Sequence, residues 1–184
     1  MTIARVFPRK TKATPTDVLA FVGDPPTILM PNDPLWNADE IHISCTFTFD
    51  LLDAEYLAKQ WECFGVPVKI GGPAFDDPGG EFFPGMYLGD GYIITSRGCN
   101  NKCWHCDVWK RIKGLQEYPV KDGWILQDDN ILACSESHIK AVFEMLNKQK
   151  HRPVFSGGLE AKLLKPWHVD LLQKAKPQEM FFCL

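Results

Sequence analysis

Cys99, Cys103 and Cys106 lie within eight residues in the segment Cys99-Asn-Asn-Lys-Cys103-Trp-His-Cys106, directly after Gly98. Iron–sulfur clusters prefer soft thiolate ligands such as these. Three cysteines leave one iron of a [4Fe–4S] cube without a protein ligand, and that iron is free to bind another molecule. The spacing therefore predicts a [4Fe–4S] cluster with an open coordination position, which is typical of a catalytic cluster.

Two other kinds of metal site use the same cysteines. A structural zinc site normally has four ligands, and His105, His138 or Cys134 could supply the fourth. A cluster that only transfers electrons would also need a fourth ligand, from Cys134, Cys45 or Cys63. Zinc sites usually contain two CxxC-like pairs, and isolated cysteines are more often small buried apolar residues. Both points favour the open cluster over these alternatives.

The CxxxCxxC pattern follows an expected strand at 92–96 and precedes alternating strands and helices. Over residues 90–184 the chain thereby resembles the radical S-adenosylmethionine superfamily. The resemblance implies that the unligated iron binds the amino and carboxylate groups of S-adenosylmethionine. It also implies reductive cleavage to methionine and a 5′-deoxyadenosyl radical, with an electron donor such as flavodoxin or ferredoxin. The substrate cannot be read from the sequence.

The same resemblance supplies candidate cofactor contacts. His105 stands before the last cysteine, where the family places a residue near the adenine. Asp128, Asp129 and Asn130 follow an expected strand at 123–127, and they resemble an Asp-Asp-Asn stretch of cobalamin-linked radical enzymes. Glu160 lies in a Gly-Gly-Leu-Glu stretch that resembles one in the same relatives.

A physical argument supports contacts at these positions, because carboxylates at the C-terminal ends of barrel strands can accept hydrogen bonds from an ammonium group. The alternatives are an ordinary turn and helix cap at 128–130 and a tight turn at the double glycine. For His105 the alternative is an exposed loop side chain.

The elements around these residues follow from hydrophobic periodicity. Beyond the cysteines we expect a helix capped by Ser135, a strand at 154–156, a helix from Pro166 to Lys174 and a strand at 179–184. The order βαβαβ predicts a parallel sheet. Earlier in the chain we expect strands at 3–7, 40–45 and 66–70, and an ordered loop through Pro34. A helix at 52–64 with Asp50 as its N-cap lies between the last two strands.

The predicted fold class is α/β, with a small N-terminal βαβ domain at 1–88, a reduced Rossmann-like unit, and a partial radical S-adenosylmethionine barrel at 89–184. Cobalamin is not expected, because the sequence contains no Asp-x-His-x-x-Gly. A full β/α barrel takes about 200 residues, so we expect a truncated barrel. The chain is then a fragment, a truncated product or half of an oligomeric assembly. An alternative function is a catalytically inactive zinc-binding or iron–sulfur interaction module.

Composition limits the partners. A net charge of −3 argues against broad attraction to nucleic acid but leaves room for a small basic patch. No apolar run approaches the roughly 20 residues that span a bilayer, so no membrane contact is expected. The first residues lack a signal-peptide core, and the odd count of seven cysteines points away from a disulfide framework. We therefore expect a cytoplasmic protein.

Overall fold

The computed structural model describes residues 1–28, 30, 32–77 and 81–183. These form two compact units, one of residues 1–80 and 86–89 and the other of residues 81–85 and 90–184. The short segment 81–85 belongs to the second unit, whereas residues 86–89, near the boundary expected at Leu88, belong to the first.

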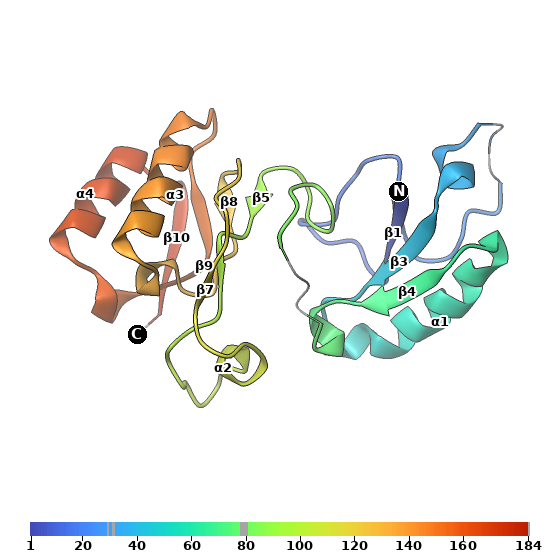
Figure 1. Cartoon of the computed structure of the whole chain (residues 1–184), viewed down its shortest axis with the longest axis horizontal. Coiled ribbons are helices and arrows are strands. Elements are labelled where there is room, and N and C mark those ends of the chain that lie inside the picture. Colours follow the sequence, from blue (N-terminus) through green and yellow to red (C-terminus); the bar gives the residue numbers. More distant parts are fainter. Residues whose placement is uncertain (29, 31, 78–80, 184) are drawn as a thin grey trace. The chain divides into compact units, whose positions relative to one another are not determined.

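The first unit is a parallel four-stranded sheet with the order β2-β1-β3-β4. Its strands are β1 (Ile3–Phe7), β2 (Ala20–Val22), β3 (Glu40–Ser44) and β4 (Val68–Gly71). Helix α1 (Leu51–Trp61) connects β3 to β4 and makes the expected βαβ unit (Figure 1). The expectation of a loop through Pro34 missed β2, because three residues are too few to show a period. Short 3-10 turns cover Pro34–Asn37, Thr48–Asp50, Glu62–Phe64 and Pro73–Phe75.

Helix α1 forms because its apolar residues recur at helical spacing. Ala54, Leu57 and Trp61 are buried on one face against the sheet. Asp50 occupies the N-cap position but makes no side-chain cap. Its buried carboxylate accepts hydrogen bonds from the Arg9 guanidinium instead, with Arg9 Nε at 2.6 Å. The expected capping role of Asp50 is therefore wrong, because an ion pair competes for the same oxygens.

The second unit contains a parallel four-stranded sheet with the order β10-β9-β8-β5, which confirms the predicted parallel sheet. The strands are β5 (Tyr92–Ile93), β8 (Ile125–Leu126), β9 (Val154–Glu160) and β10 (Glu179–Cys183). Helix α3 (Glu136–Lys148) joins β8 to β9, and α4 (Pro166–Ala175) joins β9 to β10. The two helices pack side by side (Figure 1). Residue 184, which we expected to end the last strand, lies outside the described residues.

The apolar face of α3 forms the core of this unit. Val142, Phe143 and Leu146 are buried and belong to one cluster with Leu126 and Phe155 of the sheet. The Ser135 hydroxyl accepts a hydrogen bond from the His138 amide at 3.3 Å and caps the helix as expected. Further 3-10 turns cover Ile131–Ala133 and Ala161–Leu163.

Two expected elements differ in extent. The strand expected at 92–96 is divided into β5 and β6 (Ser96–Arg97), and β6 pairs antiparallel with β7 (Gln116–Glu117). Strand β9 continues through the double glycine, where a tight turn was the alternative. Gly157 is required there, because a Cβ atom would lie 1.8 Å from the Asp128 carbonyl oxygen.

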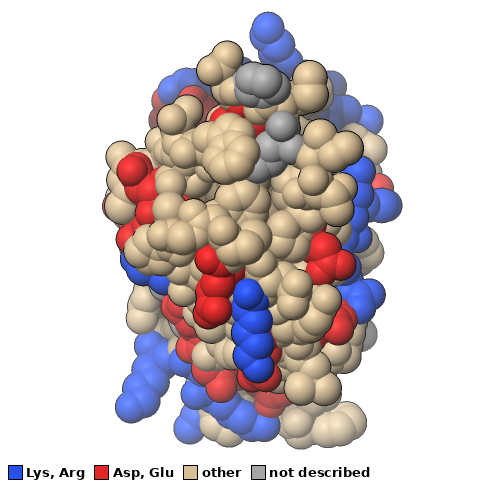
Figure 2. Space-filling model, turned by 90° about the vertical axis from the view of Figure 1, so that its right-hand side faces the viewer, with Lys and Arg blue, Asp and Glu red and all other residues tan. Residues whose placement is uncertain are grey.

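The surface carries both signs of charge. Lys and Arg side chains are interspersed with Asp and Glu on the face in Figure 2. Along the described parts of the chain, no helix has the length and apolar character needed to cross a bilayer.

Candidate functional site

The three cysteines lie on a loop that leaves the second unit between β6 and β7 and carries the short helix α2 (Val108–Arg111) (Figure 1). The β6–β7 pair closes the base of this cysteine loop, residues 98–114. Gly98 has a φ of +91°, and a Cβ atom there would lie 1.9 Å from the Gly114 carbonyl oxygen. The two ends of the loop therefore approach each other so closely that only glycine fits at position 98.

Asp128 holds the strand that enters this loop. Its carboxylate accepts hydrogen bonds from the Thr95 amide at 2.6 Å, from the Thr95 hydroxyl and from the Ser96 hydroxyl at 3.0 Å. Asp128 is 2% exposed, and burial raises the pKa of its carboxyl group above the usual range. Both of its oxygens are engaged, so the structure gives Asp128 a positioning role. Its predicted contact with a cofactor remains a prediction.

Asp129 holds the next stretch of the same strand. Its Oδ2 accepts a hydrogen bond from the Gly98 amide at 2.8 Å, one residue before the first cysteine. Arg97 Nη1 donates to the Gln127 carbonyl oxygen at 3.0 Å and lies 3.6 Å from Asp129 Oδ1. Together, Asp128 and Asp129 form a carboxylate clamp on residues 95–98.

Three predicted site residues from separate segments meet at the C-terminal ends of the strands. Asn130 Nδ2 donates to Glu160 Oε2 at 2.8 Å and lies 3.5 Å from Cys99 Sγ. Asn130 is 3% exposed, and its buried Oδ1 has no hydrogen-bond partner. An unsatisfied buried oxygen is costly in a protein interior, and it marks a place that suits a donor from a ligand.

The other predicted residues lie further along the loop. Cys103 and Cys106 are half-buried free thiols joined by a turn in which the Cys106 amide donates to the Cys103 carbonyl oxygen at 3.2 Å. His105 is exposed and lies edge-on to Trp104, with ring centroids 5.4 Å apart. His105 forms no hydrogen bond with Asn130 or Glu160, so its predicted place near an adenine remains a prediction.

The three thiols are suitable cluster ligands and share one loop, but their sulfur atoms do not converge on one point. Among the described residues, no three His, Cys, Asp or Glu side chains are arranged to hold one metal ion. A cluster would therefore require the loop to close around it, as metal ligands commonly become ordered on binding. The fixed base of the loop and its free tip suit such a closure.

Cys134, His138 and Cys45, three of the residues considered as a fourth ligand, are buried or bonded elsewhere. Cys134 is buried, and burial raises the pKa of its thiol to about 12, so it holds its proton at neutral pH. His138 Nε2 lies 3.2 Å from the Thr95 hydroxyl, in a buried contact. In the first unit, the Cys45 thiol donates to the Phe47 carbonyl oxygen and Cys63 is exposed.

Thr95, Ser96 and Gly114 also support the site, although they were not among the predicted site residues. Two polar residues at the end of an apolar strand were a signal for a buried partner, because buried hydroxyls need acceptors. The glycines at the two ends of the cysteine loop were a second signal, because a narrow neck requires close backbone approach.

Comparisons with known proteins found no match to a family model, to a curated protein or to a solved structure.

Proposed function

We propose that this chain binds a [4Fe–4S] cluster through Cys99, Cys103 and Cys106 and acts as a radical S-adenosylmethionine protein. The observation that carries the proposal is the meeting of Cys99, Asn130 and Glu160, which come from three segments far apart in the sequence. A merely structural turn at 128–130 would not require an Asn side chain between a thiol and a carboxylate. It would also leave the buried Oδ1 of Asn130 unexplained.

When bound, the cluster supplies one electron to the sulfonium of S-adenosylmethionine, which breaks a carbon–sulfur bond to give methionine and a 5′-deoxyadenosyl radical. The chain's own residues bind and orient. Glu160 can accept a hydrogen bond from an ammonium group, and Asn130 Oδ1 can accept a second one. Asp128 and Asp129 keep the strand before Cys99 in one place. A low-potential one-electron donor must supply the electron.

The topology of the second unit supports the proposal. Its four parallel strands lie in the sheet in the same order as in the sequence, and a helix follows each of the second and third strands. Successive β/α units of this kind are the building pattern of β/α barrels, in which sites form at the C-terminal strand ends. We therefore include in the proposal that this sheet is part of a radical S-adenosylmethionine barrel.

Anaerobic reconstitution with iron and sulfide tests the cluster. We expect about four iron and four sulfide per chain, and a product of 5′-deoxyadenosine after addition of S-adenosylmethionine and dithionite. Cys99→Ala should abolish cluster binding. One zinc without sulfide would refute the proposal and favour the inactive zinc module.

Asn130 provides a sharper test of the cofactor contact. Asn130→Ala should keep the iron content but weaken the change that S-adenosylmethionine causes in the EPR signal of the reduced cluster. Asn147→Ala, on the exposed side of α3, is the matched control and should behave as the wild type. An unchanged response in Asn130→Ala would remove Asn130 from the site.

A further inference from the structure

The cysteine loop is basic in an otherwise acidic chain. Among residues 99–114 there are four basic side chains against Asp107 alone, whereas the whole chain has a net charge of −3. All four are exposed: Lys102, Lys110, Arg111 and Lys113. Such a local excess creates a positive field beside the predicted cluster.

Two of these lysines are not neutralised within the protein. Lys110 pairs with Asp107 at 2.6 Å. Lys102 and Lys113 form no ion pair with any described residue, although other exposed lysines, such as Lys140 and Lys148, pair along their helix. The two free lysines are therefore available to an acidic partner.

The same loop also carries a highly exposed apolar side chain. Trp104 is 91% exposed, more than any other large apolar side chain among the described residues. Tryptophan and arginine are enriched among the residues that dominate binding energy at protein interfaces. Trp104 follows Cys103 directly, so a partner on this ring lies next to a predicted cluster ligand.

We propose that the exposed surface of the cysteine loop, including Lys102, Trp104 and Lys113, docks an acidic one-electron carrier protein of the flavodoxin or ferredoxin class. The inference rests on the proposed function, because the cluster requires one electron for each cleavage. In this step the carrier's flavin or iron–sulfur centre is oxidised by one electron and the cluster is reduced by one. No bond in the chain forms or breaks.

A single-stranded nucleic acid is the other partner that basic and aromatic side chains suggest, and the geometry favours it less. Nucleic-acid platforms stack successive bases on several aromatic rings. Of the two tryptophans in the cysteine loop, only Trp104 is exposed. Trp109 is half-buried, and its Nε1 donates to the Cys103 carbonyl oxygen at 3.2 Å.

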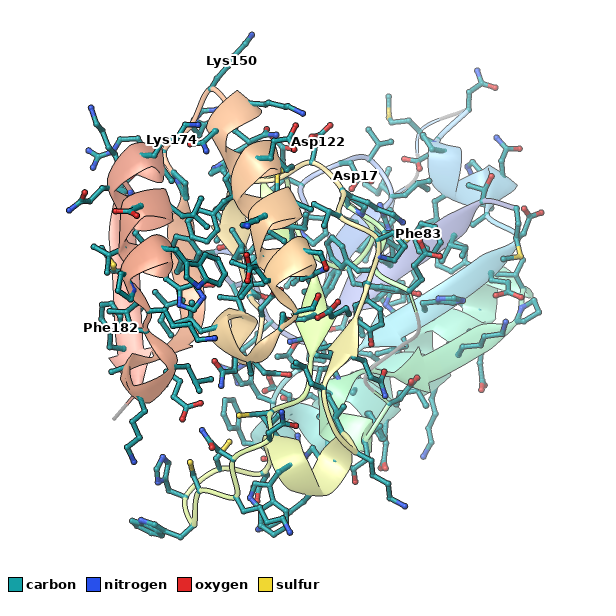
Figure 3. All side chains as sticks on the ribbon, turned by 60° about the vertical axis from the view of Figure 1, so that its left-hand side comes forward. Asp17, Phe83, Asp122, Lys150, Lys174 and Phe182 are labelled. Atoms are coloured by element: carbon teal, nitrogen blue, oxygen red, sulfur yellow. The ribbon has the colours of Figure 1, made fainter. Side chains whose placement is uncertain are left out.

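Binding of an oxidised flavodoxin to the full chain tests the docking surface without a cluster. Flavin fluorescence anisotropy should show binding that weakens about 10-fold in Lys102→Gln/Lys113→Gln at low salt and more with Trp104→Ala. The matched control is Lys150→Gln/Lys174→Gln, at the end of the unit opposite α2 (Figure 3), and it should bind as the wild type. Raising the salt should remove the difference between the double Lys variant and the wild type.

Reduction of the reconstituted cluster gives the second readout. Reduced flavodoxin should reduce the cluster about 10-fold more slowly in the double Lys variant, whereas reduction by dithionite should be unchanged. Equal flavodoxin binding in all variants would overturn the docking proposal, as would loop-dependent binding of a single-stranded oligonucleotide without any effect on flavodoxin. Failure to assemble a cluster would instead refute the proposed function, and the anisotropy result would still decide the docking.

Discussion

Replacement of Asp128 by alanine tests whether the carboxylate clamp holds the base of the cysteine loop. Asp128 accepts hydrogen bonds from the Thr95 amide, the Thr95 hydroxyl and the Ser96 hydroxyl, and Thr95 and Ser96 are fully buried. The hydroxyls can rotate toward other acceptors, but the Thr95 amide cannot. A buried donor left without a partner costs about 1–3 kcal/mol.

The expected loss follows from these terms. One orphaned amide and two weakened hydroxyl bonds together destabilise by about 4 kcal/mol, and removal of a buried carboxylate returns part of this because its desolvation cost disappears. We therefore expect Asp128→Ala to lower the free energy of unfolding of the second unit by about 3 kcal/mol. Asp128→Asn keeps one acceptor for the Thr95 amide and should cost about 1 kcal/mol.

Urea unfolding measures the change, and hydrogen exchange of the Thr95 amide localises it. Asp170→Ala is the matched control, because Asp170 is exposed on α4 and its side chain forms no hydrogen bond or ion pair with a described residue. Asp128→Ala should also lower the iron bound on reconstitution, because the loop base is no longer fixed. Equal urea midpoints for the Asp128 and Asp170 variants, with unchanged Thr95 exchange, would show that the clamp is not a support.

Three further results are expected. Gly98→Ala should lower both stability and iron content, because the added Cβ would collide with the Gly114 carbonyl oxygen. Gly85 has a positive φ too but no atom near its added Cβ, so Gly85→Ala should bind as much iron as the wild type. Equal iron contents in the two variants would refute the narrow neck. Cys134 should resist alkylation in the native state at pH 8, because burial raises the pKa of its thiol to about 12, and mass spectrometry after labelling would reveal a modified Cys134 if this reasoning were wrong. Because burial raises the pKa of Asp128, its contribution to stability is present at low pH and is lost as the pH rises through the raised pKa. The wild type should therefore lose stability relative to Asp128→Asn as the pH rises above the usual range of a carboxyl group, and parallel urea midpoints at all pH values would contradict this.

The sequence predicted the elements with strong periodicity and missed those without it. Helix α3 and strand β3 were anticipated because their apolar residues recur at regular spacing. Strand β2 was not, because a short edge strand depends on pairing with β1 rather than on its own pattern. The split between β5 and β6 could not be predicted either, because it depends on the distant partner β7.

The site was anticipated as a set of residues but not as a set of contacts. Cys99, Asn130 and Glu160 were each expected after a strand, and the C-terminal ends of parallel strands lie at one edge of a sheet. Asp128, Asp129 and Asn130 were expected to act alike. The structure distinguishes them, because Asp128 and Asp129 accept hydrogen bonds from residues 95–98 whereas Asn130 donates to Glu160.

The buried carboxylate of Asp128 fixes the base of the cysteine loop, while the cysteines lie beyond this fixed base. Burying Asp128 is costly, yet it ties two hydroxyls and an amide just before the cysteine loop. The tie continues through Thr95 to His138 on α3, while Glu117 on β7 accepts hydrogen bonds from Ser135 at the start of the same helix. A loop held this firmly at its neck can close around a ligand without moving the strands.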